Sequence, residues 1–413
     1  MHDIQLYQQI LGDTLPWQVE RVTLNKETQS IEVEMALPEQ VWACPECHVR
    51  MHVHGYERRR WRHLDSCQYR TILTADVPRV QCETHGTQAV QVPWAEKHGR
   101  FTALFERFAI DVMQACSISA ACDILGISWD EADGIKQRAV RRGLTRKKAG
   151  TPMPRLCVDE KSFGRGQDYV TLVVQAHGNR PSTVEHIADG RTTASLDAFW
   201  KSLTSEQLAG VEAVGMDMWE PYWISTMTHV PEAASKIVHD PFHLVSHMND
   251  AVNMVRRQEH RELHAEGDDR LSGTKQLWLY GIERLPPRWQ ARWDDLRDQK
   301  LKTGRAWAIK EMFRDFWACA NQEEGRLFFQ AWYSWAIRCG LNPIKKVARM
   351  MKKHLANILT FFVHRLSNAS SEGINNLVQS LIKKAYGYRN RERFKTDILF
   401  HAGGLDLYPT LSQ

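Results

Sequence analysis

Three acidic residues of this sequence occupy positions from which carboxylates can hold a metal ion against a substrate. Asp159 follows the apolar run 156–158, and Asp217 follows the apolar run 211–216. Each run suits a buried strand, so each carboxylate is expected at the rim of a sheet, where substrate reaches it and water access is limited. The third acid, Glu372, lies in a segment with helical spacing.

The helix that carries Glu372 is predicted to have one polar and one apolar face. At about 100° per residue, a single polar stripe contains Glu372, Asn376, Gln379 and Lys383. The apolar residues fall on the opposite face: Ile374, Leu377, Val378, Leu381 and Ile382. One face therefore packs on a core, while the other presents an acid, two amides and a lysine in line.

The chemistry that suits these acids is divalent-metal catalysis on a phosphodiester. Mg²⁺ prefers hard oxygen ligands, and two such ions about 4 Å apart can bridge a scissile phosphate. A single acid is more often a helix cap or a salt-bridge partner, so the interpretation depends on the three positions together. We predict that Asp159, Asp217 and Glu372 hold two Mg²⁺ ions, with Mn²⁺ as an alternative, and that Asn376 and Lys383 support the site.

Two pairs of metal-binding residues are predicted to form a structural zinc site. The pairs are Cys44 with Cys47, and Cys82 with His85. Each Cys-x2-Cys or Cys-x2-His pair delivers two ligands from a tight turn, and two pairs complete a tetrahedron. Nine cysteines, an odd count, argue against a disulfide framework. Three residues are alternative ligands if one of the four is misassigned: Cys67, His48 and His63.

A helix-turn-helix is predicted after the zinc site. A short helix stops at Gly126, and Ser128 with Glu131 forms a capping box that opens a second helix over residues 129–142. The second helix would enter the major groove of DNA. Two helices that meet at a glycine often only pack together, so the neighbouring zinc site and basic linker strengthen this interpretation.

Basic residues are clustered although the formal net charge is only +5. Such clusters can follow a DNA backbone, although many are only solvated helix faces. We expect Lys136 and Gln137, on an exposed helix face, to reach base edges, and Arg146, Lys147 and Lys148 to contact phosphates. The other predicted DNA contacts are Arg141, Arg142, Lys345, Lys346, Arg389 and Arg391.

The 413 residues suit several domains, and 43% of them are apolar, which is enough for folded cores. Alternating strand and helix patterns indicate an α/β core, and a charged, Trp-rich helical segment interrupts it. The predicted boundaries are 1–95 for a small zinc-binding β module, 96–150 for the helix-turn-helix and linker, 151–256 for the first part of the core, 257–344 for an all-helical insertion, and 345–413 for the second part of the core. The first residues do not resemble a signal peptide and no run is long enough to span a membrane, so a cytoplasmic, nucleoid-associated protein is expected.

These motifs together resemble those of the ISL3 family of bacterial insertion-sequence transposases over nearly the whole chain. The matching features include the Cys/His pairs, the helix-turn-helix and Val158-Asp159-Glu160. Further matches are Gly215-Met216-Asp217-Met218, Pro221-Tyr222, His239-Asp240-Pro241-Phe242-His243, Ser371-Glu372-Gly373-Ile374-Asn375-Asn376 and Tyr388-Arg389-Asn390-Arg391-Glu392-Arg393-Phe394. The sequence departs from the family pattern at Pro241, where a longer or basic residue is expected.

The resemblance implies an RNase H-like catalytic core whose DDE triad is Asp159, Asp217 and Glu372. It also implies that Asp240 and His243 follow the fifth strand and lie close to the active site. The long interval between the second and third acids fits a helical insertion within the core.

The expected function is that of a transposase that binds the terminal inverted repeats of its own element and catalyses Mg²⁺-dependent phosphodiester hydrolysis and strand transfer. Its partners would be double-stranded DNA, as repeats and as target, and further copies of the chain, since two DNA ends must be paired by a homodimer or a higher oligomer. One alternative is a DNA-binding regulator with an inactive RNase H-like domain, which needs no carboxylates on strand ends. Another is a sugar hydrolase with paired carboxylates, which needs no DNA-reading modules.

Overall fold

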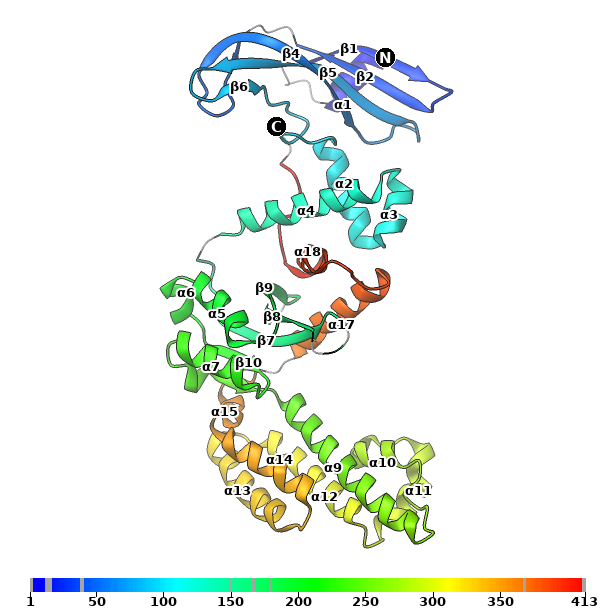
Figure 1. Ribbon diagram of the computed structural model, residues 1–413, viewed down its shortest axis with the longest axis vertical. Helices are drawn as coiled ribbons and strands as arrows, with labels where there is room; N and C mark the ends of the chain where they lie inside the picture. The colour runs from blue at the N-terminus through cyan, green and yellow to red at the C-terminus, as the bar shows by residue number, and fades with distance from the viewer. Residues whose placement is uncertain are drawn as a thin grey trace. The chain divides into compact units, whose positions relative to one another are not determined.

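The computed structural model describes residues 3–11, 17–37, 41–148, 150–164, 166, 168–178, 180–366 and 369–410. The chain forms two compact units: the first contains Met1–Lys147 and Lys384–Gln413, and the second contains Lys148–Lys383. The first unit therefore contains both ends of the chain, and the second unit is the stretch between them (Figure 1). Among the described residues, no helix is both long and apolar enough to cross a lipid bilayer.

The first unit begins with helix α1 (Asp3–Leu11) and a six-stranded sheet. The strands are β1 (Gln18–Asn25), β2 (Ser30–Ala36), β3 (Val41–Ala43), β4 (Arg50–Arg62), β5 (Arg70–Cys82) and β6 (Gly86–Ala89). Their order is β1-β2-β5-β4-β3, and β6 pairs with β5. Three tryptophans lie at the centre of the core, with Trp94 edge-on to both Trp17 and Trp61. This sheet carries the predicted zinc ligands at its turns.

Three helices follow the sheet: α2 (Ala103–Ala115), α3 (Ile118–Leu125) and α4 (Trp129–Arg146). Gly126 ends α3 in the left-handed conformation, with φ of 61°, which a residue with a Cβ adopts only with strain. The Ser128 hydroxyl accepts the Glu131 N–H, and the Glu131 carboxylate accepts the Ser128 N–H, so the predicted capping box is confirmed. The helix-turn-helix is therefore present, and its second helix is one turn longer than predicted.

The C-terminal helix α18 (Arg391–Ala402) completes this helical domain. Phe400 and Leu407 are buried in the same hydrophobic cluster as Phe105 of α2 and Ile135 of α4. The predicted boundaries assigned 345–413 to the catalytic core, whereas the residues from Lys384 onward fold with the first unit. Local sequence patterns do not reveal this pairing, because α18 and α4 are far apart along the chain.

The second unit contains a five-stranded sheet in the order β11-β10-β7-β8-β9. Its strands are β7 (Arg155–Ser162), β8 (Tyr169–Gln175), β9 (Thr183–Asp189), β10 (Ala213–Met216) and β11 (Ile237–His239). β7, β8 and β9 form an antiparallel meander, and β10 and β11 extend the sheet in parallel with β7. This is the RNase H-like arrangement that the resemblance implied.

Helices pack against this sheet: α5 (Thr193–Ser202), α6 (Ser205–Ala209), α7 (Glu220–His229), α8 (Ala233–Lys236) and α17 (Ala369–Lys384). Trp200 of α5 and Tyr222 of α7 are fully buried against Val158 and Val214 of the strands. This core fixes β7 and β10, which position the predicted carboxylates: Asp217 directly follows β10, as expected, whereas Asp159 lies inside β7, which continues to Ser162.

An all-helical region interrupts the α/β fold. It contains α9 (Pro241–Ala265), α10 (Lys275–Leu279), η1 (Ile282–Arg284), α11 (Pro287–Arg297), α12 (Lys302–Arg314), η2 (Asp315–Ala318), α13 (Gln322–Arg338), α14 (Asn342–Lys353), α15 (Leu355–Leu359) and α16 (Phe361–His364). Its core is rich in aromatic residues, among them Trp278, Phe313 and Trp332. The helical region extends beyond both expected limits, 257 and 344. Helix α9 begins directly after β11, and α14 to α16 continue beyond residue 344.

Candidate active site and metal centre

Two of the predicted metal ligands are brought together by two neighbouring inner strands of the sheet. β7 and β10 are parallel neighbours with Val158 opposite Met216. The next residue on each side, Asp159 after Val158 and Asp217 after Met216, is therefore brought beside the other. Asp159 is 9% exposed, and burial raises its pKa. The nearby carboxylate of Asp217 raises that pKa further. Two carboxylates held together in a buried place repel each other, and a bound cation relieves that repulsion.

Backbone amides orient both aspartates. Asp159 Oδ1 accepts the N–H of Glu160 at 2.8 Å, and Asp217 Oδ1 accepts the N–H of Met218 at 2.6 Å. Each side chain is therefore held by the residue that follows it, with its second oxygen directed elsewhere. Hard oxygens in a fixed, partly buried arrangement fit a divalent cation such as Mg²⁺.

Helix α17 contacts the site through a residue that the sequence analysis did not single out. Asn375 Nδ2 donates to Asp159 Oδ2 at 2.7 Å, and Lys161 Nζ donates to the Asn375 carbonyl at 3.3 Å. Asn375 is three residues after Glu372, so the two share one side of the helix. Glu372 is partly buried, whereas the predicted supporting residues Asn376 and Lys383 are exposed.

The three carboxylates do not form a closed cage. Within the described ranges, the one group of three or more metal-binding side chains whose ligand atoms all lie within 4.8 Å of one another is the Cys/His group of the first unit. The contact of α17 with Asp159 through Asn375 places Glu372 on the helix that borders the aspartates. A contribution of Glu372 to metal binding stays a prediction.

Asp240 and His243 follow β11, as expected. Asp240 is 3% exposed and occupies the N-cap position of α9, although its side chain makes no capping hydrogen bond, and His243 Nε2 lies 3.9 Å from Asp240 Oδ2. Burial raises the pKa of Asp159, and His243 is close enough to oppose that rise, so this ring lies near the carboxylates. Pro241, the departure from the family pattern, is in the first turn of α9, where its fixed φ is favourable and its missing N–H is not needed.

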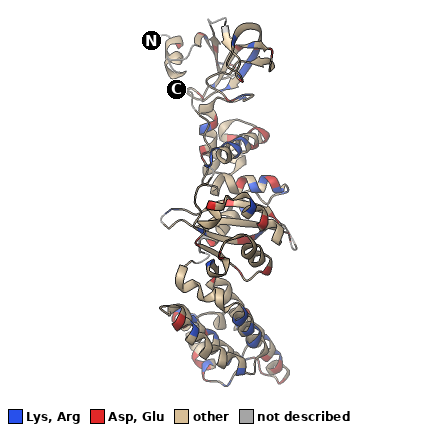
Figure 2. Cartoon of the chain, turned by 90° about the vertical axis from the view of Figure 1, so that its left-hand side faces the viewer, with Lys and Arg blue, Asp and Glu red and all other residues tan. Residues whose placement is uncertain are grey.

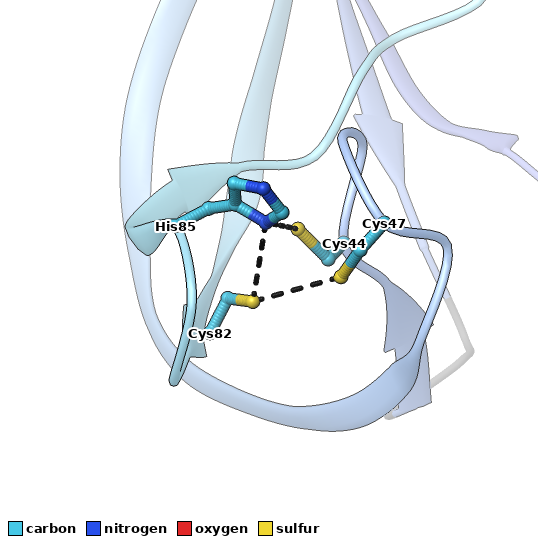
Figure 3. A group of neighbouring side chains, drawn as sticks. All are labelled: Cys44, Cys47, Cys82 and His85. Atoms are coloured by element: carbon cyan, nitrogen blue, oxygen red, sulfur yellow. Dashed lines mark hydrogen bonds between the residues drawn. The ribbon is translucent and has the colours of Figure 1, made fainter.

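The four predicted zinc ligands converge on one point (Figure 3). The Sγ of Cys82 lies 3.6 Å from Cys47 Sγ and 3.5 Å from His85 Nδ1, and Cys44 Sγ lies 3.7 Å from the same nitrogen. Backbone N–H groups of the turn, foremost that of Cys47, lower the pKa of Cys44 to about 6, which favours the metal-binding thiolate. These distances suit a tetrahedral zinc site.

The alternative zinc ligands lie elsewhere. His63 is buried and its Nδ1 is 2.9 Å from the Thr102 hydroxyl, and Cys67 is exposed near the turn before β5. His48 is exposed beside the first knuckle and is not in the Cys/His group. The original assignment of Cys44, Cys47, Cys82 and His85 is therefore confirmed as the zinc site.

The predicted DNA contacts on α4 are divided by the packing of α18. Gln137 and Arg141 are exposed, but Lys136 is 6% exposed and forms an ion pair with Asp397. The expectation that Lys136 lies on an open face was therefore wrong. Arg393 of α18 covers the same side of α4, with its guanidinium 4.2 Å from the Trp129 ring centroid.

Two of the predicted phosphate-binding arginines also have internal partners. Arg142 binds the carboxylates of Glu96 and Glu106, at 2.7 and 3.2 Å, in a largely buried position. Arg146 binds Asp406 at 2.9 Å and two further groups of the C-terminal segment. These contacts tie the helical domain together: the Arg142 side chain is nearly buried, and the Arg146 side chain is partly exposed but paired within the unit.

Other predicted contacts remain at the surface. Lys147 and Lys148 of the linker are exposed, as are Lys346 of α14 and Arg389, whereas Lys345 and Arg391 are partly buried. Helix α14 contains five basic residues and no acidic residue. Figure 2 marks the lysines and arginines of this helix and of the rest of the chain.

An RNase H-like sheet with carboxylates at one edge, in a chain that also has a zinc ribbon and a helix-turn-helix, defines a DDE enzyme that acts on DNA. Three family models match the sequence. One described as a transposase of the ISL3 DDE type matches residues 156–398, the zinc finger of transposases IS204/IS1001/IS1096/IS1165 matches 40–85, and the helix-turn-helix domain of transposase family ISL3 matches 90–140. The chain belongs to the ISL3 family of DDE transposases.

Individual relatives agree with this assignment. The chain is 29% identical over 363 residues to the transposase for insertion sequence element IS1557 of Mycobacterium tuberculosis, covering 81% of this chain and 80% of that protein. It is 25% identical over 390 residues to the transposase for IS1001 of Bordetella parapertussis, covering 93% and 95%. The family implies DNA as the partner and a divalent metal at the carboxylates.

Proposed function

We propose that this chain binds the terminal inverted repeats of its own insertion sequence and cuts and joins DNA with Asp159, Asp217 and Glu372. The supporting observation is the pair of aspartates on the neighbouring parallel strands β7 and β10, with Asp159 inside β7 and Asp217 directly after β10. Two Mg²⁺ ions, or Mn²⁺, would activate the attacking oxygen and stabilise the leaving oxygen of the phosphodiester. The first cut would release a 3′-OH, which would then attack the target DNA.

The chain's own residues set up this chemistry before any metal binds. The amides of Glu160 and Met218 fix the two aspartates, and Asn375 holds the second oxygen of Asp159. Fixed ligands lose little conformational freedom when the ions and DNA arrive, which favours the reacting geometry. Asp240 and His243 would hold the adjoining end of β11 and its helix in place.

Incubation of the full chain with end-labelled DNA from the borders of its element tests the proposal. We expect Mg²⁺-dependent cleavage at the repeat, a 3′-OH at the element end, and joined products when a target plasmid is added. EDTA and a scrambled repeat are the controls. Specific binding without cleavage in Mg²⁺ or Mn²⁺ would favour a DNA-binding regulator, and would contradict the proposed chemistry. Because two ends must be joined together, the complex on DNA is proposed to be at least a dimer, which its mass on paired ends would reveal.

The exposed face of α4 and the basic linker are expected to contribute differently to DNA binding. Changing Gln137→Ala and Arg141→Ala together should lower the preference for the repeat over random DNA, since a base contact is worth about 1–3 kcal/mol. Changing Lys147→Ala and Lys148→Ala should weaken binding to both DNAs by similar factors and flatten its salt dependence, because phosphate contacts carry no sequence information.

Titration of each double variant against both DNAs at several salt concentrations separates these effects. Lys275→Ala, which removes an exposed charge in the second unit outside the predicted DNA contacts, is the matched control for loss of a cation. If the linker variant alone loses the preference for the repeat while its salt dependence is unchanged, the two roles are reversed.

A further inference from the structure

Arg191 is held rigidly in the turn between β9 and α5. Its guanidinium lies between two aromatic rings, 4.3 Å from the centroid of Tyr169 and 4.5 Å from that of Trp219. The indole N–H of Trp219 donates to the Arg191 carbonyl at 2.8 Å, and Gly190 before it takes the positive φ of 74° that the turn requires. The guanidinium is therefore packed against two aromatic rings, which restrict its movement.

This guanidinium borders the predicted catalytic carboxylates. Its Nη1 lies 3.6 Å from Oε1 of Glu160, the residue directly after Asp159. Trp219, one of the two rings, is two residues after Asp217. Burial raises the pKa of Glu160, and the charges of Asp159 and Asp217 raise it further, so the three carboxylates are close neighbours. Arg191 thus lies beside the two segments that directly follow the predicted catalytic aspartates.

The N–H groups of this guanidinium are not used up by the protein. An arginine has five donors, and a buried structural arginine normally has most of them satisfied. The 3.6 Å contact with Glu160 is longer than a hydrogen bond, and no other described residue accepts a hydrogen bond from the Arg191 side chain. The side chain is 26% exposed, so part of it is open to solvent.

We propose that Arg191 binds a phosphate of the DNA strand beside the phosphodiester that is cut. A planar fork of N–H donors matches two oxygens of a phosphate, and a fork already held between two rings loses little freedom on binding. The contact would set the position of the scissile bond over the carboxylates. This inference rests on the proposed function, since it assumes that the DNA strand enters this site.

The test combines two substitutions of Arg191 with neutral phosphates in the DNA. In Arg191→Gln, cleavage of the element end should fall on the order of 100-fold, while binding of the whole end should weaken measurably but much less, because the first unit is intact. Arg191→Lys keeps the charge without the fork and the stacking, so it should restore only part of the rate. Arg180→Gln, an exposed arginine of the same unit, is the matched control and should cleave like the unaltered chain.

Methylphosphonates that replace single phosphates around the cleavage point then identify the contact. One such replacement should slow the unaltered chain as much as Arg191→Gln does, and should cause no further loss in that variant, because both changes remove the same interaction. A loss of folding would slow the variant on every substrate without this non-additivity. Fully additive losses at all positions would overturn the assignment.

The same comparison can be made without chemistry, by binding a pre-cut end that already has its 3′-OH. If the unaltered chain never cleaves, the proposed function is wrong. The binding comparison then still shows whether Arg191 contacts a phosphate. Non-additive losses of affinity at one phosphate would support the contact, and additive losses at all positions would overturn it.

Discussion

Replacing Asp159 or Asp217 by asparagine, or Glu372 by glutamine, is expected to abolish cleavage of the element end while binding of that end stays close to that of the unaltered chain. The changes keep side-chain size but remove the charge that holds a divalent cation. Metal ions stabilise the reaction by several kcal/mol, so the rate should fall by about 10³-fold or more. Binding should survive because the zinc module and the helix-turn-helix belong to the other unit.

A cleavage assay and a mobility-shift assay on the same DNA end measure the two effects. Glu212→Gln removes an exposed carboxylate just before β10 and is the matched control for loss of an acid in the same unit. A variant at one of the three positions that still cleaves at nearly the original rate would remove that residue from the triad. This measurement matters most for Glu372, because the contact of α17 with Asp159 is made by Asn375.

Loss of zinc is expected to unfold the N-terminal sheet and to remove specific DNA binding without disturbing the second unit. Cys44 follows β3 and Cys82 ends β5, so the metal joins two turns, each of which has one short strand, β3 or β6, beside it. Structural zinc contributes about 10–16 kcal/mol of apparent binding free energy in small zinc-finger peptides, and its removal usually unfolds them. The Cys44→Ser and Cys82→Ser variants should each lose the metal. The lower-melting part of their thermal unfolding curve should also disappear.

Elemental analysis should find about one zinc per chain in the unaltered protein, as expected for a single four-ligand site. Cys67→Ser, at an exposed cysteine outside the ligand group, should keep the zinc and the DNA binding. Retention of specific binding by both ligand variants would show that the zinc site has no part in reading the repeat.

Local patterns were sufficient where one segment determines a feature. The apolar runs before Asp159 and Asp217 predicted two strands, and the pairing of β7 with β10 brings the two acids together, but β7 continues past Asp159 to Ser162, so only Asp217 follows the end of its strand. The Cys and His pairs were predicted from tight turns of four residues, which is the scale at which ligand spacing is fixed. Gly126 and the Ser128 capping box likewise depend only on adjacent residues.

Other features depend on contacts between distant segments, and these could not be predicted from local patterns. Helical periodicity predicted which residues share the polar face of α17, but not how the helix is rotated about its axis against β7. Asn376 was therefore predicted to support the site, whereas Asn375 donates the hydrogen bond to Asp159. Lys136 appeared exposed because its partner Asp397 is 261 positions away along the chain. Arg191 is an isolated arginine in a turn, and its aromatic neighbours come from two other elements.

The packing of α18 on α4 also sets an order of events during synthesis. The ribosome releases the zinc module and α2–α4 first, then the whole second unit, and after it the segment that carries Phe400 and Asp397. Domains generally fold as they emerge, from the N-terminus onward. On a nascent chain, Lys136 therefore has no partner from α18, and the cluster that contains Phe400 is incomplete. The helix-turn-helix is therefore completed only after α18 has been synthesised, and by then the whole second unit has been synthesised as well.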